Sequence, residues 1–72
     1  MGGTAMITTQ AELRAQFWQD HPAHERQARL RGTLTKGQNA QVTDTRVAWV
    51  DYVDHMARDG SITEALAQRA TL

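Results

Sequence analysis

The chain has 72 residues and no cysteine, and its eight Lys and Arg residues balance its eight Asp and Glu residues. This length allows one small domain, and the zero net charge argues against a bulk electrostatic binder of nucleic acid or acidic membrane. The absence of cysteine excludes disulfides, thiolate metal sites and a thiol nucleophile.

The N-terminal segment offers little that can pack or anchor. No apolar run approaches the roughly 20 residues of a bilayer span, and Met1–Thr9 lacks the charged and apolar regions of a signal peptide. We therefore expect a cytoplasmic protein without membrane contact. Residues 1–8 are expected to be a disordered tail, because Gly2 and Gly3 cost entropy to order. Residues 9–72 are expected to form a single helical domain.

The first predicted helix covers residues 10–20. Thr9 and Glu12 have the spacing of a capping box, in which each side chain caps the other's backbone N–H. Leu13 and Phe17 would share the core face of this helix. The helix should end at His21, because the residue before a proline is pushed out of the helical region.

The middle of the chain is less regular. Pro22 can open a second helix that runs to Arg31 and ends at Gly32. The same residues can also form a loop, since they offer few apolar side chains and a helix this short is marginal. Residues 32–41 are rich in turn-forming residues and predict a loop.

Two further helices are predicted in the C-terminal half. Thr43 is the expected N-cap of a helix over residues 44–58, which Asp59-Gly60 should end. Ser61 and Glu64 form a second capping-box pattern, which predicts a last helix over residues 62–70. No segment alternates as a strand does. We therefore predict an all-α fold, a three- or four-helix bundle that forms a dimer.

The helix over residues 44–58 is apolar over an arc of roughly 200° at about 100° per residue. One interpretation is a central helix that its neighbours cover on both flanks. Another is that one flank contacts a second copy, because aromatic and Met side chains are enriched at interfaces. The residues of this self-association flank would be Trp49, Tyr52 and Met56.

Little in the sequence indicates catalysis. Asp51 and His55 could share a metal, but a third ligand is missing from this segment. Ser61 is better explained as a helix cap than as a nucleophile. His21 and His24 are expected on the surface, where they could make binding sensitive to pH. We expect no enzyme activity, no metal and no cofactor.

Charge segregation along the chain suggests binding instead. Residues 21–43 carry a net charge of +3, and residues 44–72 carry a net charge of −2. An acidic helix face could mimic nucleic-acid phosphates toward a basic groove of a partner. The alternative is a small DNA- or RNA-binding regulator that uses the basic segment 26–36. A third class, an assembly component, would form large homo-oligomers. The predicted partner-binding residues are Asp51, Asp54, Arg26, Arg29, Arg31 and Lys36.

The stretch Thr43–Asp54, followed by Arg58-Asp59-Gly60-Ser61-Ile62 and by Leu66–Leu72, resembles small uncharacterised proteins encoded by bacteriophages and prophages. This resemblance covers residues 43–72 and carries no assigned activity. It implies a context, because small phage accessory proteins often bind and block a host protein, including defence components such as CRISPR effectors. It favours an anti-defence or anti-CRISPR-like inhibitor in the cytoplasm of an infected bacterium.

Overall fold

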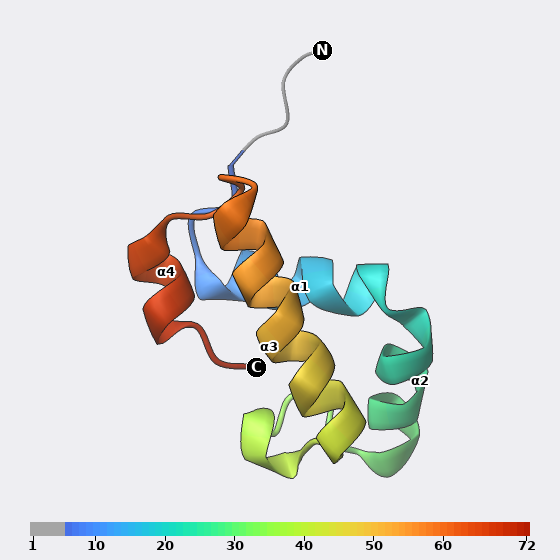
Figure 1. Ribbon diagram of the computed structural model, residues 1–72. Helices are drawn as coiled ribbons and strands as arrows, with labels where there is room; N and C mark the ends of the chain where they lie inside the picture. Colours follow the sequence, from blue (N-terminus) through green and yellow to red (C-terminus); the bar gives the residue numbers. More distant parts are fainter. Residues whose placement is uncertain (1–5) are drawn as a thin grey trace.

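The computed structural model describes residues 6–72, and within this range the protein is all-α, as predicted, with no β-strand. Helix α3 crosses α1 near the middle of the molecule, with α2 on one side and α4 on the other (Figure 1). No helix of residues 6–72 is long and apolar enough to cross a membrane. The elements are α1 (Gln10–Asp20), α2 (Pro22–Arg31), the 3₁₀ turn η1 (Gln38–Ala40), α3 (Thr43–Arg58) and α4 (Glu64–Arg69).

Helix α1 has the predicted bounds and the predicted N-cap, Thr9, although the Glu12 carboxylate reaches the Thr8 amide rather than the Thr9 amide. The hydroxyl oxygen of Thr9 accepts a hydrogen bond from the Glu12 amide at 3.2 Å, and the Glu12 carboxylate accepts one from the Thr8 amide at 3.3 Å. Hydrogen bonds from the Thr8 amide and the Thr9 hydroxyl hold the pKa of Glu12 below its ordinary value. The capping box therefore fixes the start of the helix.

The tail expected over residues 1–8 lies partly outside the described residues, which begin at Met6. Just after that point the chain is already packed. Ile7 lies against the hydrophobic core, and its N–H donates a hydrogen bond of 3.1 Å to the Ser61 carbonyl. The packed domain therefore begins before Thr9, because Ile7 has an apolar surface to cover.

Residues 22–31 are helical, so the helix alternative is confirmed over the loop. Pro22 occupies the first turn, where its missing N–H costs nothing. Gly32 ends the helix in the left-handed conformation, with φ of 72°. Ala28 is the buried residue of α2, and the Nδ1 atom of His24 lies 2.9 Å from the Thr45 hydroxyl oxygen on α3. These contacts turn one side of α2 toward α3.

Helix α3 begins one residue earlier than predicted. Thr43 is its first helical residue, and the N-cap is Val42, whose side chain makes no capping hydrogen bond. The prediction of a Thr43 cap is therefore wrong. The helix ends as predicted: Gly60 takes a φ of 76°, and the Ser61 N–H donates to the Met56 carbonyl at 3.0 Å.

Helix α4 is shorter than the predicted helix over residues 62–70, since Ile62, Thr63 and Ala70 do not belong to it. Its N-cap is Thr63, whose hydroxyl accepts a hydrogen bond from the Leu66 amide at 3.1 Å. The prediction that Ser61 caps the helix is wrong because Ile62 is drawn into the core, where it is 2 % exposed. The chain bends at Ser61 and Ile62, and the helix begins only after Thr63, whose backbone is extended.

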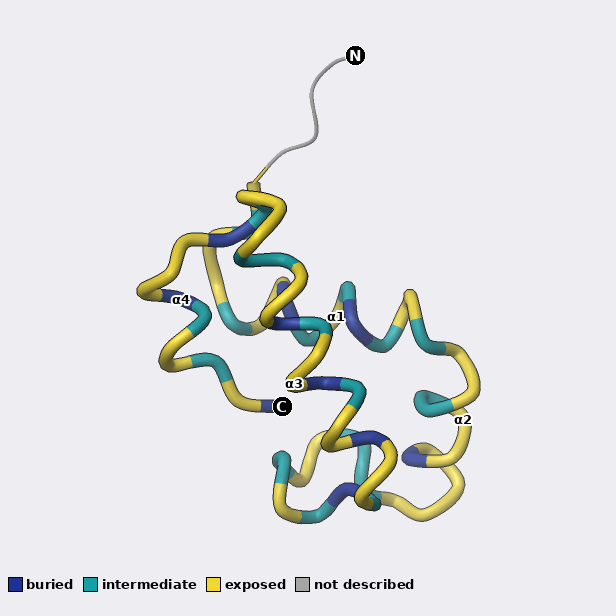
Figure 2. The backbone as a smooth tube through the Cα atoms, in the orientation of Figure 1, coloured by how far each residue is buried: buried dark blue, intermediate teal, exposed yellow. Residues whose placement is uncertain are grey.

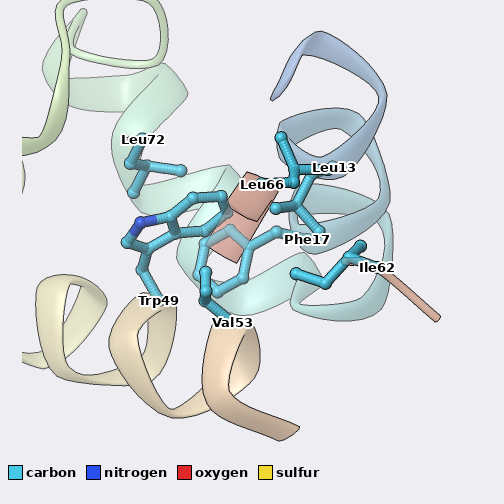
Figure 3. Close-up of a cluster of buried hydrophobic side chains, with 7 residues drawn as sticks. All are labelled: Leu13, Phe17, Trp49, Val53, Ile62, Leu66 and Leu72. Carbon is cyan, nitrogen blue, oxygen red and sulfur yellow. The ribbon is translucent and has the colours of Figure 1, made fainter. Parts of the chain in front are cut away.

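One cluster of buried side chains joins α1, α3 and α4, and Figure 2 shows where the buried positions lie along these helices. Phe17 lies at its centre and meets the Trp49 ring edge to face, with ring centroids 5.2 Å apart. The C-terminal residue, Leu72, also packs here. The seven buried residues, drawn in Figure 3, are Leu13, Phe17, Trp49, Val53, Ile62, Leu66 and Leu72.

Candidate functional site

The predicted self-association flank, Trp49, Tyr52 and Met56, faces the interior of the chain. Trp49 is 2 % exposed, and Tyr52 and Met56 pack against the core as partly buried side chains. Phe17 of α1 contacts both the Trp49 and the Tyr52 rings. The chain's own α1 therefore covers Trp49 and part of Tyr52 on this flank, and self-association through the flank stays a prediction.

The opposite side of α3 is open. At about 100° per residue, Asp54 lies half a turn round the helix from the buried Thr45. Val47 and Val50 are 54 % and 56 % exposed on this side, and both carboxylates beside them are exposed. We call Val47, Val50, Asp51 and Asp54 the α3 outer face.

Shallow hollows adjoin the α3 outer face on the side of η1 and α4. Val47, Val50 and Asp51 line a hollow of about 380 Å³ together with Gln38 of η1. Val50 and Asp54 line another hollow of about 500 Å³ together with Ala67 of α4. Val50 belongs to both hollows, so they meet at this valine.

The charged groups of this face differ in how they are paired. Asp54 forms an ion pair with Arg58 at 3.0 Å, and both side chains are exposed. His55 lies 3.1 Å from Asp59. Asp51 makes no ion pair within the described residues. Its carboxylate is therefore free to accept hydrogen bonds from another molecule.

The basic segment lies elsewhere on the molecule. Arg26, Arg29, Arg31 and Lys36 are all exposed, and Arg29 pairs with Glu25 one turn away. Arg26 is about 160° round α2 from Ala28, the residue that this helix buries. Because α2 turns its inner side toward α3, Arg26 points away from α3, whereas Arg31 lies only about 60° round the helix from Ala28. The α3 outer face points away from Thr45, the residue that α2 contacts.

The predicted contact residues therefore lie on different elements of the fold, with Asp51 and Asp54 on α3 and Arg26, Arg29 and Arg31 on α2. They belong to two candidate surfaces, one on each helix. Leu30, one of the few apolar residues of α2, was not predicted to be a surface residue. Leu30 is 82 % exposed. It lies four residues after Arg26 and therefore on the same exposed side of α2, so helical spacing could have predicted its exposure.

The histidines predicted to lie on the surface are partly buried instead. The His21 ring stacks on Phe17 with centroids 4.4 Å apart, and its Nδ1–H donates to the Phe17 carbonyl at 2.8 Å. His24 contacts Thr45. His55 stands near Asp59 rather than Asp51, and residues 6–72 contain no cluster of three or more metal-ligating side chains.

Comparisons with known protein families, with curated proteins and with solved structures found no match. The α3 outer face and the basic segment are therefore the two candidate binding surfaces of this protein. The α3 outer face combines exposed apolar side chains, hollows and an unpaired carboxylate. The basic segment combines cations with one exposed leucine.

Proposed function

We propose that this protein acts by binding a protein partner, and that the α3 outer face is the contact surface. The observation that carries this proposal is the pair Val47 and Val50, both more than half exposed in the middle of the longest helix. Protein interfaces typically combine an apolar centre with a polar rim. Here the valines are the centre, and the rim carries the carboxylates Asp51 and Asp54 together with the cations Arg46 and Arg58.

The rim suggests the chemistry of the partner. Asp51 has no ion-pair partner within residues 6–72, so it can accept charge-assisted hydrogen bonds from Arg or Lys of another protein. The Asp54 carboxylate can do the same by exchanging its exposed pair with Arg58, which is worth little in water. We therefore propose a partner surface with an apolar patch among cations, such as the edge of a nucleic-acid-binding groove.

The resemblance of residues 43–72 to small phage-encoded proteins gives this proposal a biological setting. In that setting the partner is a protein of the infected bacterium, such as a CRISPR effector, and the chain inhibits or modulates it in the host cytoplasm. Binding with an acidic face is one way to block a groove that otherwise holds phosphates. The homodimer expected from the sequence belongs to the same set of proposals.

Capture of host proteins from a bacterial lysate tests the surface. The double variant Asp51→Asn and Asp54→Asn removes two negative charges from the α3 outer face. The matched control, Gln19→Lys and Gln27→Lys, changes the net charge by the same amount at exposed positions on α1 and α2. We expect the first variant to lose a specifically retained protein and the control to keep it. Equal retention by both variants would contradict the proposal.

The basic segment supports a second candidate function, the binding of DNA or RNA. Arg26, Arg31 and Lys36 are exposed and make no ion pair within the described residues. Such cations can contact phosphates, and that binding weakens steeply as salt rises from about 50 to 200 mM. Titration of a duplex and of a single strand at about 50 mM salt tests it. Absence of binding there removes this candidate.

A further inference from the structure

A hollow of about 570 Å³ lies between α1 and the loop that follows α2. None of the described residues that line it belongs to α3, so it is separate from the α3 outer face. Two cations, Arg14 and Lys36, stand among its apolar side chains, and we call it the Trp18 hollow. The apolar side chains that line it are Ala11, Trp18, Leu34 and Leu72.

The Trp18 hollow is positively charged. No aspartate or glutamate of the described residues lines it. Neither Arg14 nor Lys36 forms an ion pair within residues 6–72, the terminal carboxylate included. The carboxylates of α1 lie on other sides of that helix: at about 100° per residue, Glu12 is about 160° from Arg14, and Asp20 is about 160° from Trp18. The hollow therefore offers two cations to an anionic ligand.

Trp18 also lines a second hollow, of about 360 Å³, on the side of α2. The acidic residue among those that line it is Glu25, and this carboxylate forms an ion pair with Arg29. The two hollows meet at Trp18. An extended anionic chain that lies across Trp18 can therefore continue into the second hollow without meeting an unpaired carboxylate of the described residues.

Arg14 is held in place by the chain itself. Its guanidinium donates hydrogen bonds to the Thr71 carbonyl at 2.6 Å and to the side-chain oxygen of Gln10 at 3.0 Å. A guanidinium has five N–H donors in a rigid plane, so donors remain for a ligand. Because the side chain is already fixed, it loses little entropy when it binds an anion.

The loop that carries Lys36 is fixed as well. The buried Gln41 holds it, since its side-chain amide donates hydrogen bonds to the Thr33 and Gly37 carbonyls. The side-chain oxygen of Gln41 accepts a third hydrogen bond, of 3.1 Å, from the Thr33 hydroxyl. Lys36 itself is exposed. The Trp18 hollow is therefore formed in the unbound chain, as ligand sites usually are.

We propose that the Trp18 hollow binds a base of a single-stranded nucleic acid and that Arg14 and Lys36 bind its phosphates. Proteins that bind single strands combine cations with aromatic rings, because every base has a face that stacks on such a ring. A base inside a duplex is already stacked and cannot enter the hollow. This inference rests on the second candidate function, nucleic-acid binding by the basic segment, and it specifies an unpaired strand as the ligand.

A strand fits this surface better than a free nucleotide does. Small-molecule sites enclose about 70–90 % of their ligand, whereas here two shallow hollows meet at one tryptophan. A nucleotide in the Trp18 hollow would leave much of its surface in water. A strand gains further contacts where it continues past Trp18.

Three probes test the proposal on the wild-type chain. The first is a fluorescent oligothymidylate of about 10 nucleotides, a typical length for a small single-strand site. The second is an abasic phosphodiester chain of the same length, and the third is a duplex. Fluorescence anisotropy at about 50 mM salt measures each affinity. We expect the oligothymidylate to bind about 5- to 150-fold more tightly than the abasic chain, as about 1–3 kcal/mol for one stacked base implies. It should also bind more tightly than the duplex.

Variants of Trp18 show whether the base stacks there. Trp18→Leu removes the ring and should bring the oligothymidylate and the abasic chain to equal affinity. Trp18→Phe keeps a ring and should retain most of the difference. Because Trp18 also packs against the core, circular dichroism must show that each variant is folded. Should Trp18→Leu fail to fold, the probes on the wild-type chain and a variant of Lys36 decide the question.

Lys36→Gln tests the phosphate contact at an exposed position. It should weaken both single-stranded probes by the same factor, because both carry phosphates. It should also reduce the slope of log affinity against log salt by about 0.7, the value of one phosphate contact on a single strand. Arg69→Gln removes the same charge from an exposed, unpaired position outside the hollow and should bind as the wild type does.

Several results would overturn the proposal. One is equal binding of the oligothymidylate and the abasic chain by the wild type, and another is the absence of binding to either. A duplex, a thymidine monophosphate or a hexaglutamate peptide that binds as tightly as the strand would also contradict it. So would a preference for bases that persists in folded Trp18→Leu, or a Lys36→Gln variant that binds like the wild type.

The second candidate function can be judged separately with the double variant Arg26→Gln and Arg31→Gln, which lies outside the Trp18 hollow. If the wild type binds duplex and strand equally and this variant loses both, the basic segment binds nucleic acid and the Trp18 site is wrong. If the wild type prefers the strand and this variant binds it normally, the Trp18 site stands and these two arginines take no part in binding.

Discussion

The phenol of Tyr52 donates a hydrogen bond of 3.2 Å to the carboxylate of Asp20, which joins the middle of α3 to the last residue of α1. The same ring lies edge to face with Phe17 and with His21. The partial burial of the phenol, together with the nearby Asp20 charge, raises the pKa of Tyr52 to about 12.

This pKa predicts a loss of stability at alkaline pH. The folded state holds the phenolic proton more tightly than the unfolded state, in which the pKa is about 10. The free energy of unfolding should therefore fall as pH rises from about 10 to 12, because the unfolded state releases the proton first. Ultraviolet absorbance of tyrosinate, measured beside circular dichroism, follows both events.

Tyr52→Phe is the matched variant for this prediction. It removes the titrating group and the hydrogen bond to Asp20 but keeps the ring contacts of Tyr52 with Phe17 and His21. We expect it to show no tyrosinate transition and a weaker dependence of unfolding on pH in this range. A normal phenolic titration near pH 10 in the wild-type chain would show that Tyr52 is not held by Asp20.

Trp49→Ala should destabilise the protein strongly. The indole is 2 % exposed and packs against Phe17, so its removal leaves a cavity in a small core. Losses of about 3–5 kcal/mol are typical of such changes. Urea unfolding followed by circular dichroism measures the effect. Val50→Ala on the α3 outer face is the control and should change stability by less than about 0.5 kcal/mol.

Two alanine substitutions distinguish the observed N-cap of α4, Thr63, from the predicted one, Ser61. Thr63 accepts the hydrogen bond from Leu66 that starts the helix, whereas Ser61 lies outside the helix. Thr63→Ala should cost about 0.5–2 kcal/mol of stability, in the range of other N-cap losses. Ser61→Ala should cost clearly less. The reverse order in thermal unfolding would show that the capping box at Ser61 forms after all.

Local sequence signals predicted much of this fold, and their failures have a physical cause. The bounds of α1 and α2 follow from Thr9, Pro22 and Gly32, whose effects act within a turn. The start of α4 was misplaced because Ser61 and Thr63 can both cap, and only the burial of Ile62 in a distant core decides between them. Packing between residues far apart in the sequence cannot be predicted from a local sequence pattern.

The candidate surfaces were harder to predict for the same reason. Asp51 and Asp54 could be placed on an exposed face from helical spacing alone. Their separation from Arg26 depends on which side of α3 receives α2, and that is fixed by the contact of His24 with Thr45. The exposure of Leu30 follows from the same docking, since only Ala28 of α2 is buried.

Site-specific photo-crosslinking tests the central claim, that the α3 outer face is the binding surface. The chain has no cysteine, so Val50→Cys and Gln19→Cys each create one site for a photoreactive label, on α3 and on α1. Both positions are exposed. After illumination in host lysate, we expect a discrete crosslinked product from position 50 and none from position 19. A product from position 19 with none from position 50 would contradict the claim.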